Sequence, residues 1–194
     1  MAKKNTGTKS RIVSAAWKLF YDQGFDTTTI DDIIWESGTS KGSFYHYFES
    51  KEALLGSLAY LFDEKYEELE CTISESENSI DVLLWLNREL FDMIEKRVDL
   101  ELLKGLFASQ LNAKGEKQLL DRGRVYYKLL RKIISAGQEK GEITASQSVN
   151  EIVRYYAFLE RSLLYDWCMV GGEYSLKENA NAKMPFFLEY IKNK

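Results

Sequence analysis

Hydrophobic residues recur at intervals of three and four along most of the chain, which is the spacing of one face of an α-helix. The first segment with this pattern begins at Ser10 and ends before Gly24, where a C-terminal cap is expected. Its apolar positions are Ile12, Ala15, Ala16, Leu19 and Phe20. Longer amphipathic helices are predicted at about 79–97, 99–111, 115–140, 147–170 and 175–192.

Three shorter helices are predicted between residues 24 and 62. The third of them begins at Ser50, and the side chains that can cap the first two are Thr28 or Thr29 and Thr39 or Ser40, respectively. One proline and 12 glycines in 194 residues leave few helix breakers. The predicted fold class is therefore all-α, with about nine helices.

Residues 28–51 have the pattern with the most specific chemistry. Two helices of about seven residues, joined through Ser37-Gly38-Thr39, have the dimensions of a helix-turn-helix, because glycine supplies the positive φ of the turn. Phe44 and Phe48 lie on the inward face of the second helix, whereas Lys41, Gly42, Tyr45 and His46 face outward. Such a face fits the major groove of DNA. The alternative is that Tyr45 and His46 are ordinary half-buried aromatic residues.

Over about its first 55 residues the chain resembles the N-terminal signature of the TetR family of bacterial transcriptional regulators. The residues that carry the resemblance are Gly24-Phe25-Asp26-Thr27-Thr28-Thr29-Ile30, Ile33, Gly38, Ser40-Lys41-Gly42-Ser43-Phe44-Tyr45, Tyr47-Phe48 and Ser50-Lys51-Glu52-Ala53-Leu54. The resemblance implies an N-terminal three-helix DNA-binding domain, residues 1–50. A larger helical domain for dimerisation and ligand binding, residues 51–194, would follow it.

The same resemblance implies a dimer that binds a pseudo-palindromic operator in double-stranded DNA through its third helix. A small-molecule effector, which the sequence does not identify, would bind the C-terminal domain and release the DNA. The residues expected to contact DNA are Thr28, Thr29, Thr39, Ser40, Lys41, Gly42, Ser43, Tyr45, His46 and Lys51. Ser43 and His46 depart from the commoner residues of the family, so the preferred bases cannot be taken from a relative.

The charge distribution is uneven. The net charge is −4, yet residues 1–18 carry five bases and no acid. Residues 1–62 carry seven bases and seven acids, so the acidic excess belongs to the remainder of the chain. A basic N-terminal end would attract an anionic polymer to that end of the molecule. The alternative is that it is a solubilising tail.

The segment 149–170 is apolar nearly all round, so it must be buried on every side. We expect it to pack both on its own core and on a second subunit, together with the last segment of the chain. The residues predicted at this homodimer interface are Phe158, Leu163, Leu164, Trp167, Phe187 and Tyr190. The alternative is a central core helix in a monomer. Pro185 is expected to kink or restart the last helix.

An effector pocket would use aromatic side chains and a few polar groups. The candidates are Trp85, Phe91, Phe107, Tyr126, Tyr127, Tyr156 and Arg161. The alternative is that the aromatic residues are plain core. Arg161 could face a ligand carboxylate, bridge to Glu160 or Asp166, or reach solvent.

Other classes of protein are less well supported. Two distant cysteines, Cys71 and Cys168, and the lack of a signal peptide indicate a reduced cytoplasmic protein. With one histidine, His46, no metal site, no catalytic centre and no cofactor is expected, and no apolar run is long enough to span a membrane. Two rival functions remain: an architectural DNA-binding protein without an effector, and a helical small-molecule-binding protein or enzyme with a vestigial helix-turn-helix.

Overall fold

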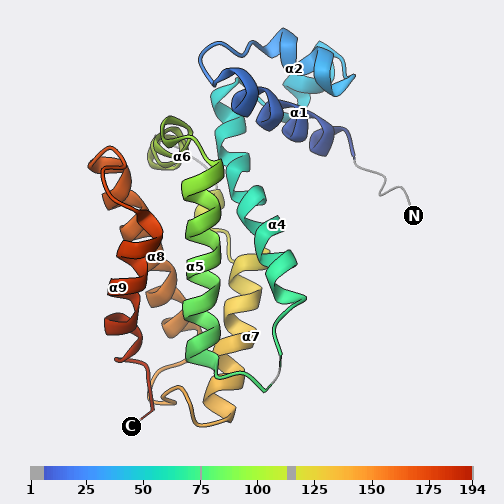
Figure 1. Cartoon of the computed structure of the whole chain (residues 1–194). Helices are drawn as coiled ribbons and strands as arrows, with labels where there is room; N and C mark the ends of the chain where they lie inside the picture. Colours follow the sequence, from blue (N-terminus) through green and yellow to red (C-terminus); the bar gives the residue numbers. More distant parts are fainter. Residues whose placement is uncertain (1–6, 75, 113–116, 194) are drawn as a thin grey trace. The chain divides into compact units, whose positions relative to one another are not determined.

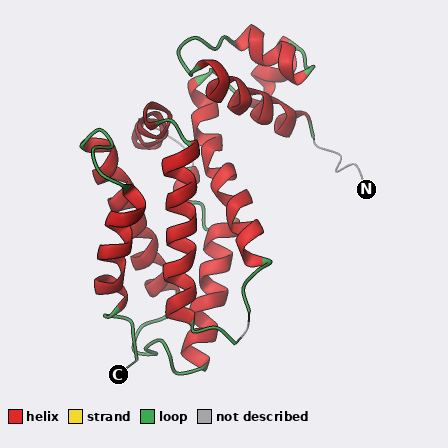
Figure 2. Ribbon diagram, in the orientation of Figure 1, coloured by secondary structure: helices red, strands yellow, loops and turns green. Residues whose placement is uncertain are grey.

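The computed structural model describes residues 7–74, 76–112 and 117–193. Within these ranges the regular elements are all helices, as Figure 2 shows, and the predicted all-α fold is confirmed. In chain order they are α1 (Thr8–Gln23), α2 (Ile30–Ser37), α3 (Lys41–Tyr47), the 3-10 helix η1 (Glu52–Ser57), α4 (Leu58–Glu70), α5 (Ser79–Arg97), α6 (Leu100–Asn112), the 3-10 helix η2 (Gln118–Leu120), α7 (Val125–Glu139), α8 (Val149–Met169) and α9 (Leu176–Leu188).

The chain divides into two compact units. We call them the N-terminal unit, which comprises Met1–Ala59 and Glu101–Leu119, and the C-terminal unit, which comprises Tyr60–Leu100 and Leu120–Lys194. The N-terminal unit thus includes α1 to η1 and nearly all of α6. The assignment of DNA binding to residues 1–50 and of the other functions to 51–194 stays a prediction.

The N-terminal unit is built around one apolar core. Its buried members come from α1 to η1, and α6 adds Leu102. They are Ile12, Ala16, Phe20, Ile33, Phe44, Phe48, Leu54, Leu55 and Leu102. Gly105 on α6 allows the close approach of η1, because a Cβ atom at Gly105 would lie 2.9 Å from a methyl group of Leu55. The first three helices are therefore packed together with α6.

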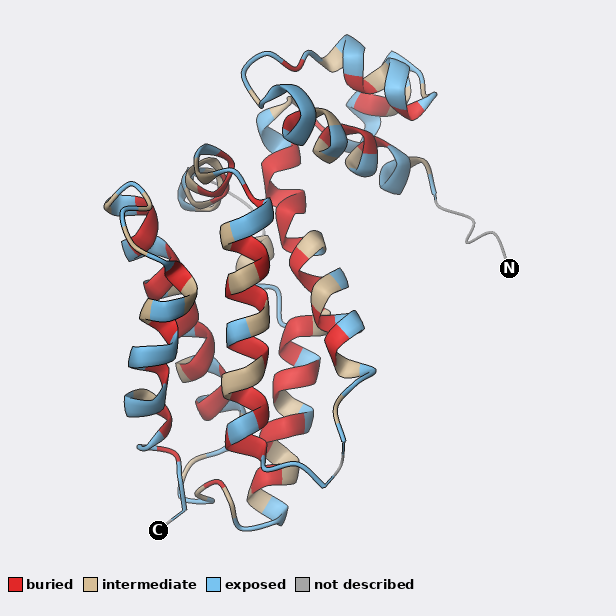
Figure 3. Ribbon diagram, in the orientation of Figure 1, coloured by how far each residue is buried: buried red, intermediate tan, exposed pale blue. Residues whose placement is uncertain are grey.

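The C-terminal unit is a bundle of long helices. Helix α5 packs against α7 and α9, and α8 also packs against α7 and α9, as the ribbons in Figure 1 show. Figure 3 shows the buried residues of these helices along the faces that meet. Leu83, Leu86 and Phe91 on α5 are fully buried there. The amphipathic spacing predicted from the sequence places these side chains in the core.

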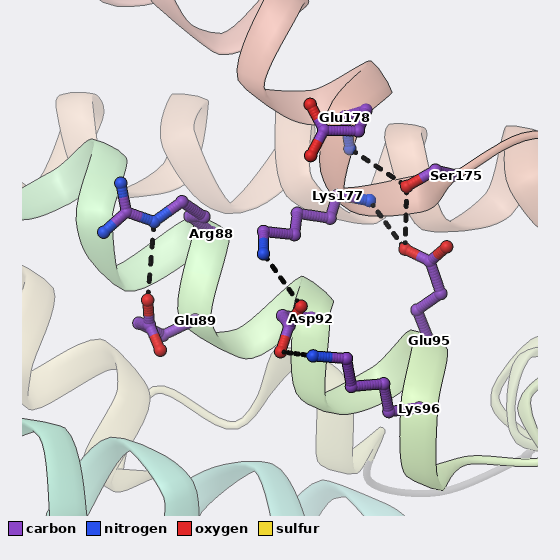
Figure 4. Close-up of polar contacts among 8 residues, drawn as sticks. All are labelled: Arg88, Glu89, Asp92, Glu95, Lys96, Ser175, Lys177 and Glu178. Carbon is purple, nitrogen blue, oxygen red and sulfur yellow. Dashed lines mark hydrogen bonds and ion pairs between the residues drawn. The ribbon is translucent and has the colours of Figure 1, made fainter.

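Polar contacts hold the start of α9 against α5 (Figure 4). The Glu95 carboxylate accepts hydrogen bonds from the Ser175 hydroxyl and from the backbone N–H of Lys177, each at 3.1 Å. The Lys177 ammonium lies 2.9 Å from Asp92, which also pairs with Lys96 at 2.7 Å. The hydrogen bonds from Lys96 and Lys177 lower the pKa of Asp92 below its ordinary value.

The predicted helix at 115–140 is wrong in its first part. Residues 115 and 116 lie outside the described residues, Gln118–Leu120 is a 3-10 helix, and α7 begins only at Val125. The reason is a tertiary contact: the backbone N–H of Tyr126, in the first turn of α7, donates to Asp63 of α4 at 3.2 Å. This carboxylate caps the helix from another part of the sequence.

Helix α9 does not restart at Pro185. The helix runs without a break from Leu176 past the proline to Leu188, so it ends within one turn of Pro185. Proline has no backbone N–H, so it removes a hydrogen bond from the helix. So close to the end of α9, that loss affects only the last turns.

Candidate DNA-binding, effector and dimer surfaces

Helices α2 and α3 form the helix-turn-helix predicted from the sequence. Gly38 has φ of 60° and ψ of 35°, and its left-handed conformation ends α2. Thr29 caps α2 in a reciprocal pair with Asp32, and Ser40 caps α3 by accepting from the backbone N–H of Ser43 at 3.1 Å. The turn and both helix starts are therefore determined by local side chains.

One face of α3 is anchored and the other is open. Phe44 is fully buried and packs beside Phe48, with 5.9 Å between the ring centroids. Lys41, Gly42, Tyr45 and His46 are exposed, as expected for the outward face. The Lys41 ammonium forms only a long, exposed contact with Asp31, at 3.6 Å. This surface can donate hydrogen bonds to base edges and phosphates without rearranging the core.

Most hydroxyl groups of the predicted DNA-binding residues form hydrogen bonds within the protein. Thr28 is buried, and its hydroxyl donates to the Gly24 carbonyl at 2.7 Å. Thr29 and Ser40 are engaged as caps, and Ser43 lies 2.9 Å from the Ser40 oxygen. The Thr39 hydroxyl lies 2.7 Å from that of Ser37. The position of Thr28 leaves it no surface with which to contact DNA.

Lys51 has a different environment from the one predicted. Its ammonium donates to the carbonyls of Phe25 at 2.6 Å and Thr28 at 2.9 Å, and it lies 4.3 Å from the centre of the Phe25 ring. The charge that was expected to hold a phosphate therefore links the α1–α2 loop to the start of η1. The sequence could not show this, because the carbonyls lie more than 20 positions away.

Lys51→Met is expected to lower the free energy of unfolding by about 1–2 kcal/mol, because it removes charge-assisted hydrogen bonds but keeps the aliphatic stem. Urea denaturation followed by circular dichroism measures the loss. Lys18→Met is the control, since Lys18 pairs with Glu36 on the surface and the loss is expected to be clearly smaller than for Lys51→Met. Unchanged stability of Lys51→Met, with a shallower salt dependence of DNA binding, would instead identify Lys51 as a phosphate contact.

The basic N-terminal end is only partly described. Lys3 and Lys4 lie outside the described residues, Lys9 and Arg11 are exposed on α1, and Lys18 is paired with Glu36 at 2.6 Å. Trp35 was not among the predicted site residues, although it is 88% exposed on α2. The signal was present, because the inward positions Ile30, Ile33 and Ile34 place residue 35 on the opposite side of the helix.

The predicted pocket residues fall into different places. Phe91 is core on α5, and Phe107 belongs to the N-terminal unit. Trp85 lines an open groove of about 320 Å³ beside the start of α5, with Thr72, Glu77, Asn78, Asp81 and Val82.

The other four pocket candidates lie in the C-terminal unit near a buried polar cluster that the sequence analysis did not find. Tyr126, Tyr127 and Tyr156 are buried there, and Arg161 donates to the Tyr127 hydroxyl at 3.1 Å. Five members of the cluster were not predicted to meet: Asp63, Tyr66, Asn87, Arg124 and Glu160. They are polar residues in predicted helices, and their spacing alone does not show that they face one another.

The predicted interface residues also divide into two groups. Leu163, Leu164 and Trp167 are buried inside the protomer and Phe187 is half-buried. Phe158 is 59% exposed on α8 and Tyr190, just after α9, is 65% exposed. Further large apolar side chains are exposed on these two packed helices, namely Tyr165, Met169 and Phe186.

Two further features bear on the class of protein. None of the helices in the described ranges combines the length and apolar character that crossing a bilayer requires. Within the same ranges, no three His, Cys, Asp or Glu side chains are grouped closely enough to hold a metal ion.

The arrangement combines a helix-turn-helix, as in DNA-binding proteins, with a helical C-terminal unit. Residues 12–58 match the family described as bacterial regulatory proteins, tetR family. The chain is 31% identical over 147 residues, 74% of both chains, to YvdT, an uncharacterized HTH-type transcriptional regulator of Bacillus subtilis. It is 29% identical over 143 residues, 71% of both chains, to the HTH-type transcriptional repressor DhaR of a Mycobacterium species. The chain belongs to the TetR family of transcriptional regulators.

A solved structure has the same fold. FadR of Thermus thermophilus, a TetR-family transcriptional repressor in complex with lauroyl-CoA, superposes with a TM-score of 0.76 over 93% of both chains, at 24% identity. The likeness extends over both units of the chain, whereas the family match is limited to the N-terminal residues.

Proposed function

We propose that this protein is a cytoplasmic, effector-responsive repressor that binds a pseudo-palindromic DNA operator as a homodimer. The observation that carries the proposal is the outward face of α3, where Lys41, Gly42, Tyr45 and His46 are exposed while Phe44 and Phe48 anchor the helix. A short helix held in this way can enter the major groove and present its first turns to base edges.

The exposed apolar side chains of α8 and α9 support the homodimer. Phe158, Tyr165 and Met169 are spaced by seven and four residues, so they share one face of α8. Phe186, which is 81% exposed, lies in the last turn of α9, and the exposed Tyr190 follows just after the helix. An apolar surface of this kind on neighbouring helices fits a two-fold interface in which each helix meets its symmetry mate.

The proposed mechanism is a shift between two arrangements of the dimer. In one arrangement the two copies of α3 lie about 34–36 Å apart and match successive major grooves. An effector that binds better to the other arrangement weakens DNA binding by the ratio of its two affinities. The lauroyl-CoA bound to the FadR of similar fold supports the presence of an effector site in this protein.

The test is selection of random DNA duplexes by the purified protein, followed by a salt titration on the enriched site. We expect an inverted repeat to be enriched and the affinity to fall steeply with salt. Lys41→Ala and Tyr45→Ala are each expected to weaken operator binding by about 1–3 kcal/mol with unchanged circular dichroism.

Lys132→Ala is the matched control for Lys41→Ala. Lys132 is similarly exposed and, like Lys41, contacts an acid on the surface, but it lies on α7. Its replacement removes the same charge and should leave operator affinity within about 0.5 kcal/mol. Equal losses in the two lysine variants would mean that only net charge matters, and failure to enrich any sequence would overturn the proposal.

A further inference from the structure

A carboxyl group is buried near the middle of α8. Glu160 is 4% exposed. One oxygen accepts a hydrogen bond from the Asn87 side chain on α5 at 2.8 Å, and the other accepts from the Tyr126 hydroxyl on α7 at 2.5 Å. One turn earlier on α8, the Tyr156 hydroxyl donates to the Leu83 carbonyl at 2.7 Å. Three helices therefore direct polar groups into one buried site.

The nearby cations are engaged with other groups. Arg124 pairs with Asp63 through two nitrogens at 2.9 and 3.0 Å, and Arg161 donates to the Tyr127 hydroxyl. Glu160 forms no ion pair within the described part of the chain. Burial raises the pKa of Glu160 above its ordinary value, although the hydrogen bonds it accepts act in the opposite direction. The site thus holds a buried carboxyl group that forms no ion pair with the described residues, although the charge of the neighbouring Arg161 also lowers its pKa. A charge buried without a paired partner is costly in a protein interior.

The hydroxyl group of Tyr66 lies near this carboxyl group. Tyr66 on α4 is 2% exposed, and its hydroxyl oxygen accepts no hydrogen bond from the described residues. Its ring centroid lies 5.0 Å from that of Tyr126, and after burial the charge of Glu160 is the largest influence on its pKa, which is raised. A hydrogen bond to the Glu160 side chain also raises the pKa of Tyr66, which places the Tyr66 hydroxyl close to that carboxyl group. The Tyr66 oxygen keeps its capacity to accept a hydrogen bond.

We propose that the cluster of Tyr66, Asn87, Tyr126, Tyr156 and Glu160 binds the positively charged nitrogen of an organic amine, and that the effector of this regulator is such a cation. This inference rests on the proposed function and adds the chemical class of the effector to it.

The chemistry of the cluster favours a cation over an anion. An ammonium group only donates hydrogen bonds, and the Glu160 carboxylate and the Tyr66 oxygen can both accept them. The electron-rich faces of tyrosine rings also attract a cation. A ligand carboxylate or phosphate would find no cation in this cluster with which to pair.

The test compares protonated amines with alcohols of the same skeleton. Benzylamine and 2-phenylethylamine at pH 7, each against its alcohol, are titrated into the full-length wild-type protein and into Glu160→Gln by isothermal calorimetry. We expect the wild type to prefer both amines, and Glu160→Gln to lose that preference by roughly tenfold or more. Glu67→Gln, at an exposed position on α4, is the control for loss of one acid and should keep the preference.

Tyr66→Phe is a second variant, because it removes a hydroxyl whose oxygen accepts no hydrogen bond from the described residues. We expect it to fold as stably as the wild type and to bind the amines several-fold more weakly while binding the alcohols unchanged. Equal binding of amines and alcohols by the wild type, absence of amine binding, or an unchanged preference in Glu160→Gln would each overturn the inference.

Operator binding without any probe is measured on the same samples. Retained operator binding with no amine preference would overturn the amine inference alone. Loss of selective DNA binding by the wild type would overturn the proposed function, while the calorimetry would still decide whether the cluster binds amines.

Discussion

Replacing Arg124 with alanine is expected to lower the free energy of unfolding by about 3–5 kcal/mol, because it leaves a buried acid without its cation. Arg124 and Asp63 are 8% and 7% exposed, and the pair is joined by two hydrogen bonds. Asp63 also accepts from the backbone N–H of Tyr126, so the unpaired carboxylate would lie at the start of α7. Chemical denaturation followed by circular dichroism measures the effect.

Two comparisons make this result interpretable. Lys132→Ala breaks the exposed pair with Glu70 at 2.7 Å and is expected to cost less than about 1 kcal/mol. The double variant Asp63→Leu with Arg124→Met removes both charges, and it should be clearly more stable than Arg124→Ala. If Arg124→Ala proved no less stable than Lys132→Ala, the pair would not be the buried contact described here.

Replacing Phe158 and Phe186 together with aspartate is expected to convert the protein into monomers. Both side chains are exposed on the protomer, at 59% and 81%, so the charges can be placed without disturbing its core. Because a dimer binds two half-sites at once, the monomer is expected to lose roughly 100-fold or more in operator affinity. Light scattering after size-exclusion chromatography measures the mass, and a DNA-binding titration measures the affinity.

Leu111→Asp provides the matched control. Leu111 is 70% exposed on α6, so the change again places a charge at an exposed apolar position, but within the N-terminal unit. We expect this variant to stay dimeric. A dimer of unchanged mass from the Phe158 and Phe186 double variant would contradict the proposed interface.

The N-terminal unit could be predicted from the sequence in considerable detail. The starts of α2 and α3 depend on Thr29 and Ser40, whose side chains bond to backbone groups three residues away. The turn between the helices depends on Gly38, which has the positive φ that its residue type permits. Because these interactions span at most a few residues, the pattern of residue types places the turn and narrows each helix start to two neighbouring residues.

Contacts between distant parts of the chain could not be predicted in this way. Lys51 was expected on the DNA surface, yet its ammonium is bonded to carbonyls of the α1–α2 loop. The start of α7 is ten residues later than predicted, because Asp63 supplies the cap from α4. In both cases the partner is a backbone group or an acid whose position depends on how the helices pack.

The burial of the apolar helix α8 was also predicted only in part from the sequence. Its sequence indicated burial on every side, but hydrophobic spacing does not distinguish the face that meets the protomer's own core from the face left for another subunit. The structure places Leu163, Leu164 and Trp167 inside and leaves Phe158 exposed.

The sequence by itself thus determined the helical class, the helix-turn-helix motif and, by resemblance, the family, and it narrowed the caps of α2 and α3 to two candidates each. Helix periodicity and capping depend on interactions within a turn or two, which the order of residues specifies directly. Only the tertiary structure decided that Glu160, Asn87, Tyr66 and Tyr126 meet, that Arg124 neutralises Asp63, and which side of α8 stays open. Those outcomes depend on the crossing of four helices, and the crossing is set by the packing of all their side chains together.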